Sequence, residues 1–262
     1  MSRGQDKNRA YMKKDILLIG AIHGDEPLGP EILAKIDKNN RFDWIIGNPK
    51  ALFLKKREYQ KDLNRSAPGE ISSEIYESRR AAEILSLSKE YKYVIDIHGS
   101  TKKTGVFIII TKPTKENFKL AALLNIKKIV YWPSFDKELE GPLSEFFNCG
   151  LEIECGPKNS KKIKKELENI LLNFLDNYKK REKSSFIKQM KRKEVYQVYG
   201  SLKKKQKNIK LQEFKLTTGG TKEKFYPIFI GGYTNLVCYK TKKLNSQEIF
   251  TLFKENKNAK NN

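Results

Sequence analysis

Short apolar runs rich in Val and Ile alternate along this chain with stretches of helical periodicity. Strands of a parallel sheet that is covered on both faces have such nearly continuous apolar sequences, and helices connect them. The sequence therefore predicts an α/β fold with a mixed, mostly parallel sheet flanked by helices. Residues 70–91 contain no Gly or Pro, which favours one long helix there. We expect strands at residues 15–22, 42–47, 93–97, 105–111, 128–132 and 151–155, and helices at residues 30–36, 70–91, 116–126, 142–148 and 160–180.

The character of the sequence changes after about residue 183. A polar, charged stretch is followed by short β-type runs such as EVYQVYG and FYPIFIGG, which are separated by Lys- or Gly-rich turns. We therefore expect an α/β domain at residues 1–183, and a small C-terminal all-β domain with a tail at residues 184–262.

The chain is predicted to be a soluble, cytoplasmic protein. Its apolar runs are strand-sized, whereas a transmembrane helix needs about 20 consecutive apolar residues. No apolar segment follows the charged N-terminus before the first strand, which argues against a secretory signal. Cys149, Cys155 and Cys238 form no C-x-x-C pair, which suits a reducing compartment, and we assign them no role.

The formal net charge of +22 first suggests a protein that binds nucleic acid. The lysines are scattered, however, and runs such as residues 161–166 and 202–210 lack regularly interleaved aromatic residues that would stack on bases. Solvated faces in a Lys-rich chain explain the charge better, so we favour this explanation over a nucleic-acid partner. The positive field would instead attract small anionic substrates.

The chain has only two histidines, and each one directly follows an expected strand. His23 precedes Glu26 by three residues, with a tight turn between them, and His98 closes the run YVIDIH. Ligands of open α/β sheets bind beyond the carboxyl ends of the strands, so the two segments would converge there. Two imidazoles and one carboxylate suit a catalytic zinc ion, which keeps one coordination position open. His23, Glu26 and His98 are therefore candidate ligands of one Zn²⁺ ion.

Each of these signals has a simpler interpretation when it is taken alone. The pair His23 and Glu26 can mark the start of a helix, where an acidic side chain interacts favourably with the helix dipole. A single buried histidine is more often a hydrogen-bonded core residue than a ligand. The combination with other polar segments is what favours a metal site.

Two further segments add groups suited to substrate binding and catalysis. Arg57, Asn64 and Arg65 lie close together in sequence, and a guanidinium fork matches a carboxylate, to which an amide can add a hydrogen bond. Glu152 and Glu154 belong to the strand at 151–155, where a carboxylate beside zinc-bound water can act as general base. Side chains two residues apart share one face of a strand, so the pattern alone leaves the choice between them open.

Five motifs resemble, in the same order, those of the succinylglutamate desuccinylase/aspartoacylase family, a branch of the zinc carboxypeptidase-like superfamily. The motifs are HGDE at 23–26, DLNR at 62–65, YESRRAAEI at 76–84, DIHG at 96–99 and ECGP at 154–157. The resemblance covers residues 15–157 and extends more loosely to about residue 240. It implies a zinc carboxypeptidase-like fold and a deacylase that cleaves the amide bond of an N-acyl amino acid.

The resemblance also implies roles for individual residues. The zinc ligands would be the two histidines and the glutamate named above, and Glu154, in the family's E-x-G-P context, would activate the water. Arg57 would polarise the scissile carbonyl, while Asn64 and Arg65 would hold the carboxylate of the amino-acid part. Tyr233 is the nearest match to a tyrosine that the family's C-terminal domain contributes to the substrate site.

Two other functions stay open at this point. The first is a zinc carboxypeptidase that acts on a peptide or peptidoglycan fragment with the same metal and the same arginine clamp. The second is a non-catalytic basic protein that binds nucleic acid or an anionic surface, for which steep salt dependence without a bound metal is expected.

Overall fold

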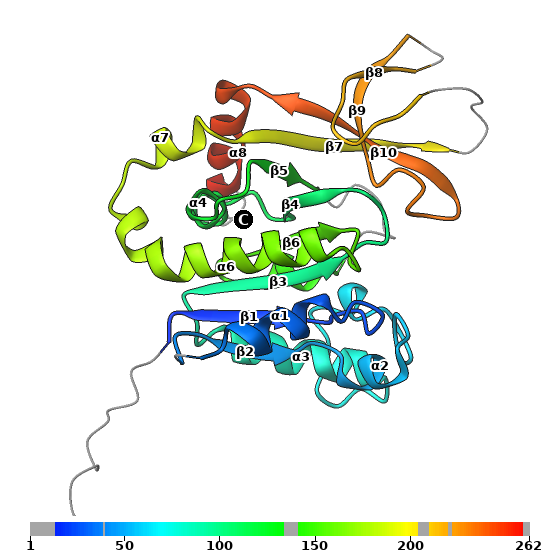
Figure 1. The fold of residues 1–262 in the computed structure, drawn as a ribbon, viewed down its shortest axis with the longest axis vertical. Coiled ribbons are helices and arrows are strands. Elements are labelled where there is room, and N and C mark those ends of the chain that lie inside the picture. The colour runs from blue at the N-terminus through cyan, green and yellow to red at the C-terminus, as the bar shows by residue number, and fades with distance from the viewer. Residues whose placement is uncertain (1–13, 39, 134–140, 204–209, 220–221, 259–262) are drawn as a thin grey trace, which may run out of the picture.

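The computed structural model describes residues 14–38, 40–133, 141–203, 210–219 and 222–258. Within this part of the chain, the strands form one sheet in the order β2-β1-β3-β6-β4-β5-β7-β10-β9-β8 (Figure 1). The strands are β1 (Ile16–Gly20), β2 (Asp43–Ile46), β3 (Tyr93–Gly99), β4 (Gly105–Ile110), β5 (Lys128–Tyr131), β6 (Gly150–Gly156), β7 (Glu194–Lys203), β8 (Thr217–Thr218), β9 (Lys224–Ile228) and β10 (Leu236–Leu244). The helices are α1 (Leu28–Ile36), α2 (Pro49–Leu54), the 3₁₀ turn η1 (Leu63–Arg65), α3 (Tyr76–Ser88), α4 (Lys115–Leu123), α5 (Leu143–Phe146), α6 (Lys161–Glu182), α7 (Phe186–Met190) and α8 (Ser246–Asn258).

The N-terminal part of the sheet is parallel, as the sequence predicts. β1 lies between β2 and β3, and β3 pairs with β6, all in parallel. β4 runs antiparallel to β6, and β5 then pairs in parallel with both β4 and β7. The sheet is therefore mixed, and the carboxyl ends of β1, β3 and β6 lie next to one another at one edge.

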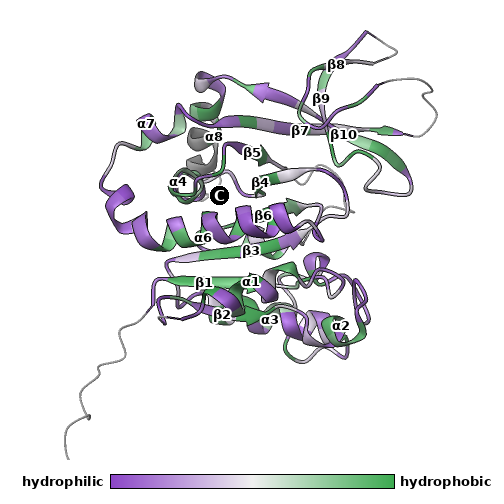
Figure 2. Cartoon of the chain, viewed as in Figure 1, coloured by the Kyte–Doolittle hydropathy of each residue, from purple (hydrophilic) through white to green (hydrophobic). Residues whose placement is uncertain are grey.

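Helices cover both faces of the sheet, and alternate side chains of β1 accordingly belong to different apolar cores. Ile16 and Leu18 of β1 belong to a core that α1, α4 and α6 complete on one face. Leu17 and Ile19 of the same strand belong to a second core, completed by α3 and α5 on the other face. Figure 2 shows the central strands as mainly hydrophobic, as expected for strands that are buried on both sides.

α6 confirms the helix predicted at residues 160–180. Ser160 caps it by accepting a hydrogen bond from the backbone N–H of Ile163. Its buried stripe faces the sheet and its charged face is exposed, which gives the alternating colours of Figure 2. Among the described residues, no helix combines the length and the apolar character that crossing a membrane requires.

The helix predicted at residues 70–91 is shorter in the structure, where α3 begins only at Tyr76. Ile71 and Ile75, which are four residues apart as on one face of a helix, are 63% and 41% exposed. Side chains also satisfy the backbone before α3 begins, since Ser73 Oγ accepts from the N–H of Ile75 and Gln60 Oε1 from that of Tyr76. Such local hydrogen bonds compete with helix formation, and the exposure of both isoleucines means that a longer helix would gain little from burying them.

The C-terminal residues are mainly β-structure, as predicted, and also contain α7 and α8. β10 pairs antiparallel with β7 and β9, and the parallel contact of β7 with β5 joins these strands to the rest of the sheet (Figure 1). The predicted domain boundary falls at Lys183, the C-cap of α6, and the division into two domains stays a proposal. The connection between β9 and β10 carries Tyr233.

Candidate metal centre and active site

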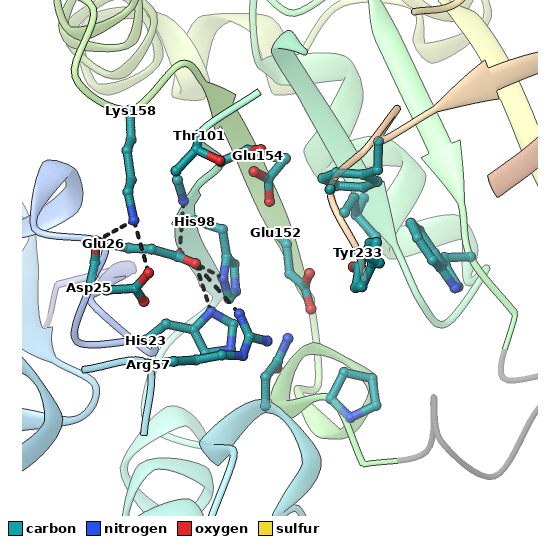
Figure 3. A pocket seen from close by; sticks show the side chains of 18 of the residues that line it. His23, Asp25, Glu26, Arg57, His98, Thr101, Glu152, Glu154, Lys158 and Tyr233 are labelled. Carbon is teal, nitrogen blue, oxygen red and sulfur yellow. Dashed lines mark hydrogen bonds and ion pairs between the residues drawn. The ribbon is translucent and has the colours of Figure 1, made fainter. Parts of the chain in front are cut away.

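The three predicted metal ligands meet at the carboxyl ends of two neighbouring parallel strands (Figure 3). His23 and Glu26 lie in the loop between β1 and α1, and His98 is the penultimate residue of β3. One nitrogen from each histidine and one oxygen of the carboxylate lie within 4.8 Å of one another. All three side chains are buried, so an ion at this point would be largely shielded from solvent.

Glu26 lies between the two imidazole rings. Its Oε1 atom is 2.9 Å from Nδ1 of His23, and its Oε2 atom is 3.3 Å from Nδ1 of His98. The backbone N–H of Gly99 donates to Oε2 at 2.9 Å and thereby fixes the carboxylate. Both Nδ1 atoms thus face one carboxylate, and this set of two nitrogens and one oxygen fits the ligand set of a catalytic zinc ion.

The outer nitrogens of both histidines contact carboxylates that the sequence analysis did not single out. Nε2 of His23 lies 3.0 Å from Asp62 Oδ1, and Nε2 of His98 lies 2.9 Å from Asp96 Oδ2. A carboxylate on the outer nitrogen holds the tautomer in which Nδ1 carries the free lone pair. The spacing of Asp96 and His98 gives a usable signal, because two residues along a strand return to the same face.

Charge interactions in this cluster favour bound positive charge. Burial alone would lower the pKa of His23, but Glu26 and Asp62 outweigh it and raise that pKa to about 9. Burial alone would raise the pKa of Glu26, yet the two histidines hold that pKa well below its usual range. The carboxylates therefore stabilise cations at this point, whether these are protons on imidazole or a metal ion.

Gly24 allows the ligand loop to pack directly against α2. A Cβ atom at this position would lie 2.0 Å from the backbone carbon of Ala51, which no real side chain tolerates. The N–H of Gly24 also donates to the backbone oxygen of Arg57 at 3.2 Å. The motif HGDE therefore requires glycine at its second position, because the loop that carries His23 and Glu26 touches the backbone of α2 there.

Arg57 is positioned by the same carboxylate that holds the first histidine. Its Nη2 atom donates to Asp62 Oδ2 at 2.8 Å, and its Nη1 atom lies 4.0 Å from Glu26 Oε1. The fully buried Glu77 of α3 organises the connecting loop by accepting hydrogen bonds from backbone N–H groups of residues 59–61. Glu77 belongs to the motif YESRRAAEI, but its role in this loop was not predicted from the sequence.

Asn64 and Arg65 lie in η1 and line the same pocket as His23, Glu26 and His98. The Oδ1 atom of Asn64 accepts a hydrogen bond from the backbone N–H of Leu143 at 3.1 Å, so the amide Nδ2 is the donor available to the pocket. Tyr233 reaches the same pocket, where its ring packs edge-on against Tyr239 with centroids 5.3 Å apart.

Glu154 lies opposite His98 in the pairing of β3 with β6. Its side chain is buried, lines the pocket and accepts no hydrogen bond from the described part of the chain. Burial, together with the nearby charge of Glu26, raises the pKa of Glu154 to about 8. Glu152 also lines the pocket, as the shared strand face predicts.

One pocket brings together all eight residues predicted for the site, and their chemical roles remain proposals. Lys158 also lines it, and this residue was not predicted. Its Nζ atom forms an ion pair with Asp25 Oδ2 at 3.0 Å (Figure 3). The eight residues are His23, Glu26, Arg57, Asn64, Arg65, His98, Glu154 and Tyr233.

Known proteins share sequence similarity with this chain in the region that holds the site. The sequence profile of the succinylglutamate desuccinylase/aspartoacylase catalytic domain matches residues 12–180. A probable aspartoacylase of Prochlorococcus marinus (strain MIT 9515) is 34% identical over 160 residues, and one of Synechococcus sp. (strain CC9605) is 29% identical over 160 residues. Each match covers 54% of this chain and 53% of the relative, so the chain spans about half the length of the curated relatives it matches.

Solved structures share the fold. Murine aminoacylase 3 is similar with a TM-score of 0.66 and 17% identity, over 88% of this chain and 96% of that one. The succinylglutamate desuccinylase from Chromobacterium violaceum is similar with a TM-score of 0.64 and 15% identity, over 89% and 86% of the two chains. The match to the catalytic-domain profile covers more than half of the sequence, and the chain therefore belongs to the succinylglutamate desuccinylase/aspartoacylase family.

Proposed function

We propose that the protein is a zinc-dependent hydrolase that cleaves the amide bond of an N-acyl amino acid. The observation that carries this proposal is the position of Glu154, a buried carboxylate without a hydrogen-bond partner in the described chain, in one pocket with His23, Glu26 and His98. Metal-assisted amide hydrolysis needs a metal site with a general base beside it. Membership of the family, and relatives named as an aspartoacylase and an aminoacylase, support a deacylase.

The ion would be held by Nδ1 of His23, Nδ1 of His98 and the carboxylate of Glu26. When bound, Zn²⁺ supplies Lewis acidity, which lowers the pKa of a bound water towards ~7 and stabilises developing negative charge. Asp62 and Asp96 hold both imidazoles with Nδ1 facing the ion site. The backbone N–H of Gly99 donates a hydrogen bond to Oε2 of Glu26 and thereby fixes the carboxylate of this third ligand.

Glu154 is the proposed general base. It takes a proton from the attacking water and returns it to the nitrogen of the leaving amine. Its buried carboxylate lines the pocket beside the ion site, and a general base must lie within hydrogen-bond reach of the proton that it takes.

Arg57, Asn64 and Arg65 would bind the substrate. Arg57 donates a hydrogen bond to the scissile carbonyl oxygen, and its ion pair with Asp62 keeps the guanidinium at the edge of the metal cluster. The Nδ2 donor of Asn64 and the fork of Arg65 clamp the α-carboxylate of the amino-acid part. The amide that reacts would thereby lie between the side chains of Asn64 and Arg65 and the carboxylate of Glu154.

The test is a hydrolysis screen with the zinc-loaded protein. N-acetyl- and N-succinyl-amino acids are compared with short peptides that have a free C-terminus, each with and without a chelator. We expect amino-acid release from N-acyl substrates that stops with chelator and returns with zinc. Preferential cleavage of peptides would favour a carboxypeptidase instead, and the absence of any hydrolysis by protein with one bound zinc ion would contradict the proposal.

A further inference from the structure

Glu152 lines the pocket but takes no part in the proposed mechanism. It precedes Glu154 by two residues on β6, and Figure 3 shows its carboxylate on the pocket wall between His98 and Tyr233. The residue is only 5% exposed. Its Oε1 atom accepts a hydrogen bond from Ser144 Oγ at 2.6 Å, whereas Oε2 accepts none from the described part of the chain.

Glu152 also lacks an ion-pair partner among the described residues. A carboxylate oxygen of Glu152 lies within 4.8 Å of a ring nitrogen of His98, but the hydrogen bond it accepts in the described chain comes from Ser144. Ser144 Oγ in turn lies 3.1 Å from Thr111 Oγ1, and Thr111 lines the same pocket. A buried carboxylate is costly unless a cation or several donors accompany it. The free oxygen of Glu152 is therefore a place where a donor group on a ligand gains a strong hydrogen bond.

The Arg and Lys side chains that line the described pocket already have an anionic partner or a role in the proposed function. Arg57 is paired with Asp62 at 2.8 Å, and Lys158 is paired with Asp25 at 3.0 Å. Arg65 is the residue to which the proposed function assigns the α-carboxylate of the substrate. A second carboxylate on the substrate would find no further cation in the described lining and would share the pocket with Glu152.

We infer that the substrate carries a single carboxylate and presents a hydrogen-bond donor, ideally an ammonium group, to Glu152. The inference rests on the proposed function and names its substrate class, the N-acyl derivatives of amino acids whose side chain carries a hydrogen-bond donor and no carboxylate. A donor N–H satisfies Oε2 of Glu152, whereas a substrate carboxylate in its place meets a like charge and leaves Oε2 without a donor. Glu152 thus selects against N-acyl derivatives of aspartate and glutamate.

The test measures kcat/KM for N-acetyl-L-asparagine and N-acetyl-L-aspartate, which have nearly the same shape and differ in charge. Nα-acetyl-L-ornithine serves as the ammonium-bearing probe. The zinc-loaded wild type is compared with Glu152→Gln and with Glu90→Gln, which removes the same charge from an exposed residue close to the amino end of β3. Zinc content and Tm of each variant verify that it is folded and loaded.

We expect the wild type to favour the asparagine and ornithine derivatives over the aspartate derivative by about tenfold or more. Glu152→Gln should reduce this ratio to about threefold or less, mainly through KM, and Glu90→Gln should leave it unchanged. A wild-type preference for the aspartate derivative, or a ratio that Glu152→Gln does not alter, would overturn the inference while the deacylase function stands. If the zinc-loaded wild type hydrolyses no N-acyl amino acid, the proposed function is wrong and the inference is lost with it.

Discussion

The Nε2 atom of His98 lies 2.9 Å from the Oδ2 atom of Asp96, two residues earlier on the same strand. Because this contact engages the outer nitrogen, Nδ1 faces Glu26 at a distance of 3.3 Å. A ring held in this way has one tautomer and one orientation, and it is a more basic ligand. Asp96 is therefore a positioning residue for the proposed zinc site.

Replacing Asp96 should weaken zinc binding while the three ligands remain in place. We expect Asp96→Asn to lower the zinc affinity by about 10- to 100-fold, because the amide no longer stabilises the imidazole as a carboxylate does. Competition with a chelating dye measures this affinity. Asp176→Asn, at an exposed position of α6, is the control, and an unchanged affinity in Asp96→Asn would contradict the role of Asp96.

Gly24→Ala should destabilise both the fold and the ligand loop. The added Cβ atom would lie 2.0–2.3 Å from backbone atoms of Ala51 and Leu52, so that either the loop or α2 must move. We expect a loss of about 1–3 kcal/mol in the free energy of unfolding, together with weaker zinc binding. Gly200→Ala is the matched control, since the nearest atom to its Cβ would be 3.5 Å away. Equal urea midpoints for the two variants would refute the packing argument.

Glu154→Gln should separate metal binding from catalysis. Glutamine has nearly the same shape but cannot take a proton from water, so we expect kcat to fall by about 10²- to 10⁴-fold with zinc content unchanged. Metal analysis and steady-state kinetics on the same preparation provide both readouts. Full activity in this variant would mean that another group is the base.

Lys193 provides a test of pH-dependent stability away from the site. Its ammonium group donates to the backbone oxygens of Leu124 and Ile126, and burial together with Arg181 lowers its pKa to about 8. Between that value and about 10.5, the unfolded chain holds one more proton than the folded chain, so the free energy of unfolding rises with pH.

Lys193→Met should remove this rise, because methionine does not titrate. Urea unfolding at several pH values between about 8 and about 10.5 measures the difference from the wild type. Lys191→Met, two residues earlier and exposed, should keep the wild-type slope. An equal slope in Lys193→Met would show that the lysine does not titrate differently in the folded chain.

The sequence predicts the central sheet well, and also the meeting of His23, Glu26 and His98, because both follow from short-range patterns. Runs of Val and Ile locate the buried strands, and the position of a histidine directly after a strand indicates the edge of the sheet where it lies. His23 and His98 meet because β1 and β3 are neighbours. Alternation along β6 likewise places Glu152 and Glu154 together in the pocket.

Features that depend on contacts between distant segments were missed. Asp62 and Glu77 act through a loop that no periodicity describes, the former on His23 and the latter on backbone N–H groups. The spacing of Ile71 and Ile75 mimics a helix, but both side chains are exposed and turn hydrogen bonds prevail. β5 and β7 pair although they are far apart in the chain, and the sequence of neither strand indicates this pairing.

The central claim is that two imidazoles and one carboxylate hold a single zinc ion beside Glu154. Anomalous X-ray diffraction at the zinc absorption edge tests it most directly on crystals grown with zinc. We predict one peak about 2.0–2.2 Å from Nδ1 of His23, Nδ1 of His98 and an oxygen of Glu26. A peak at the other candidate cluster of the described residues, formed by Asp96, His98 and Glu152, or no peak near His23, would contradict the account.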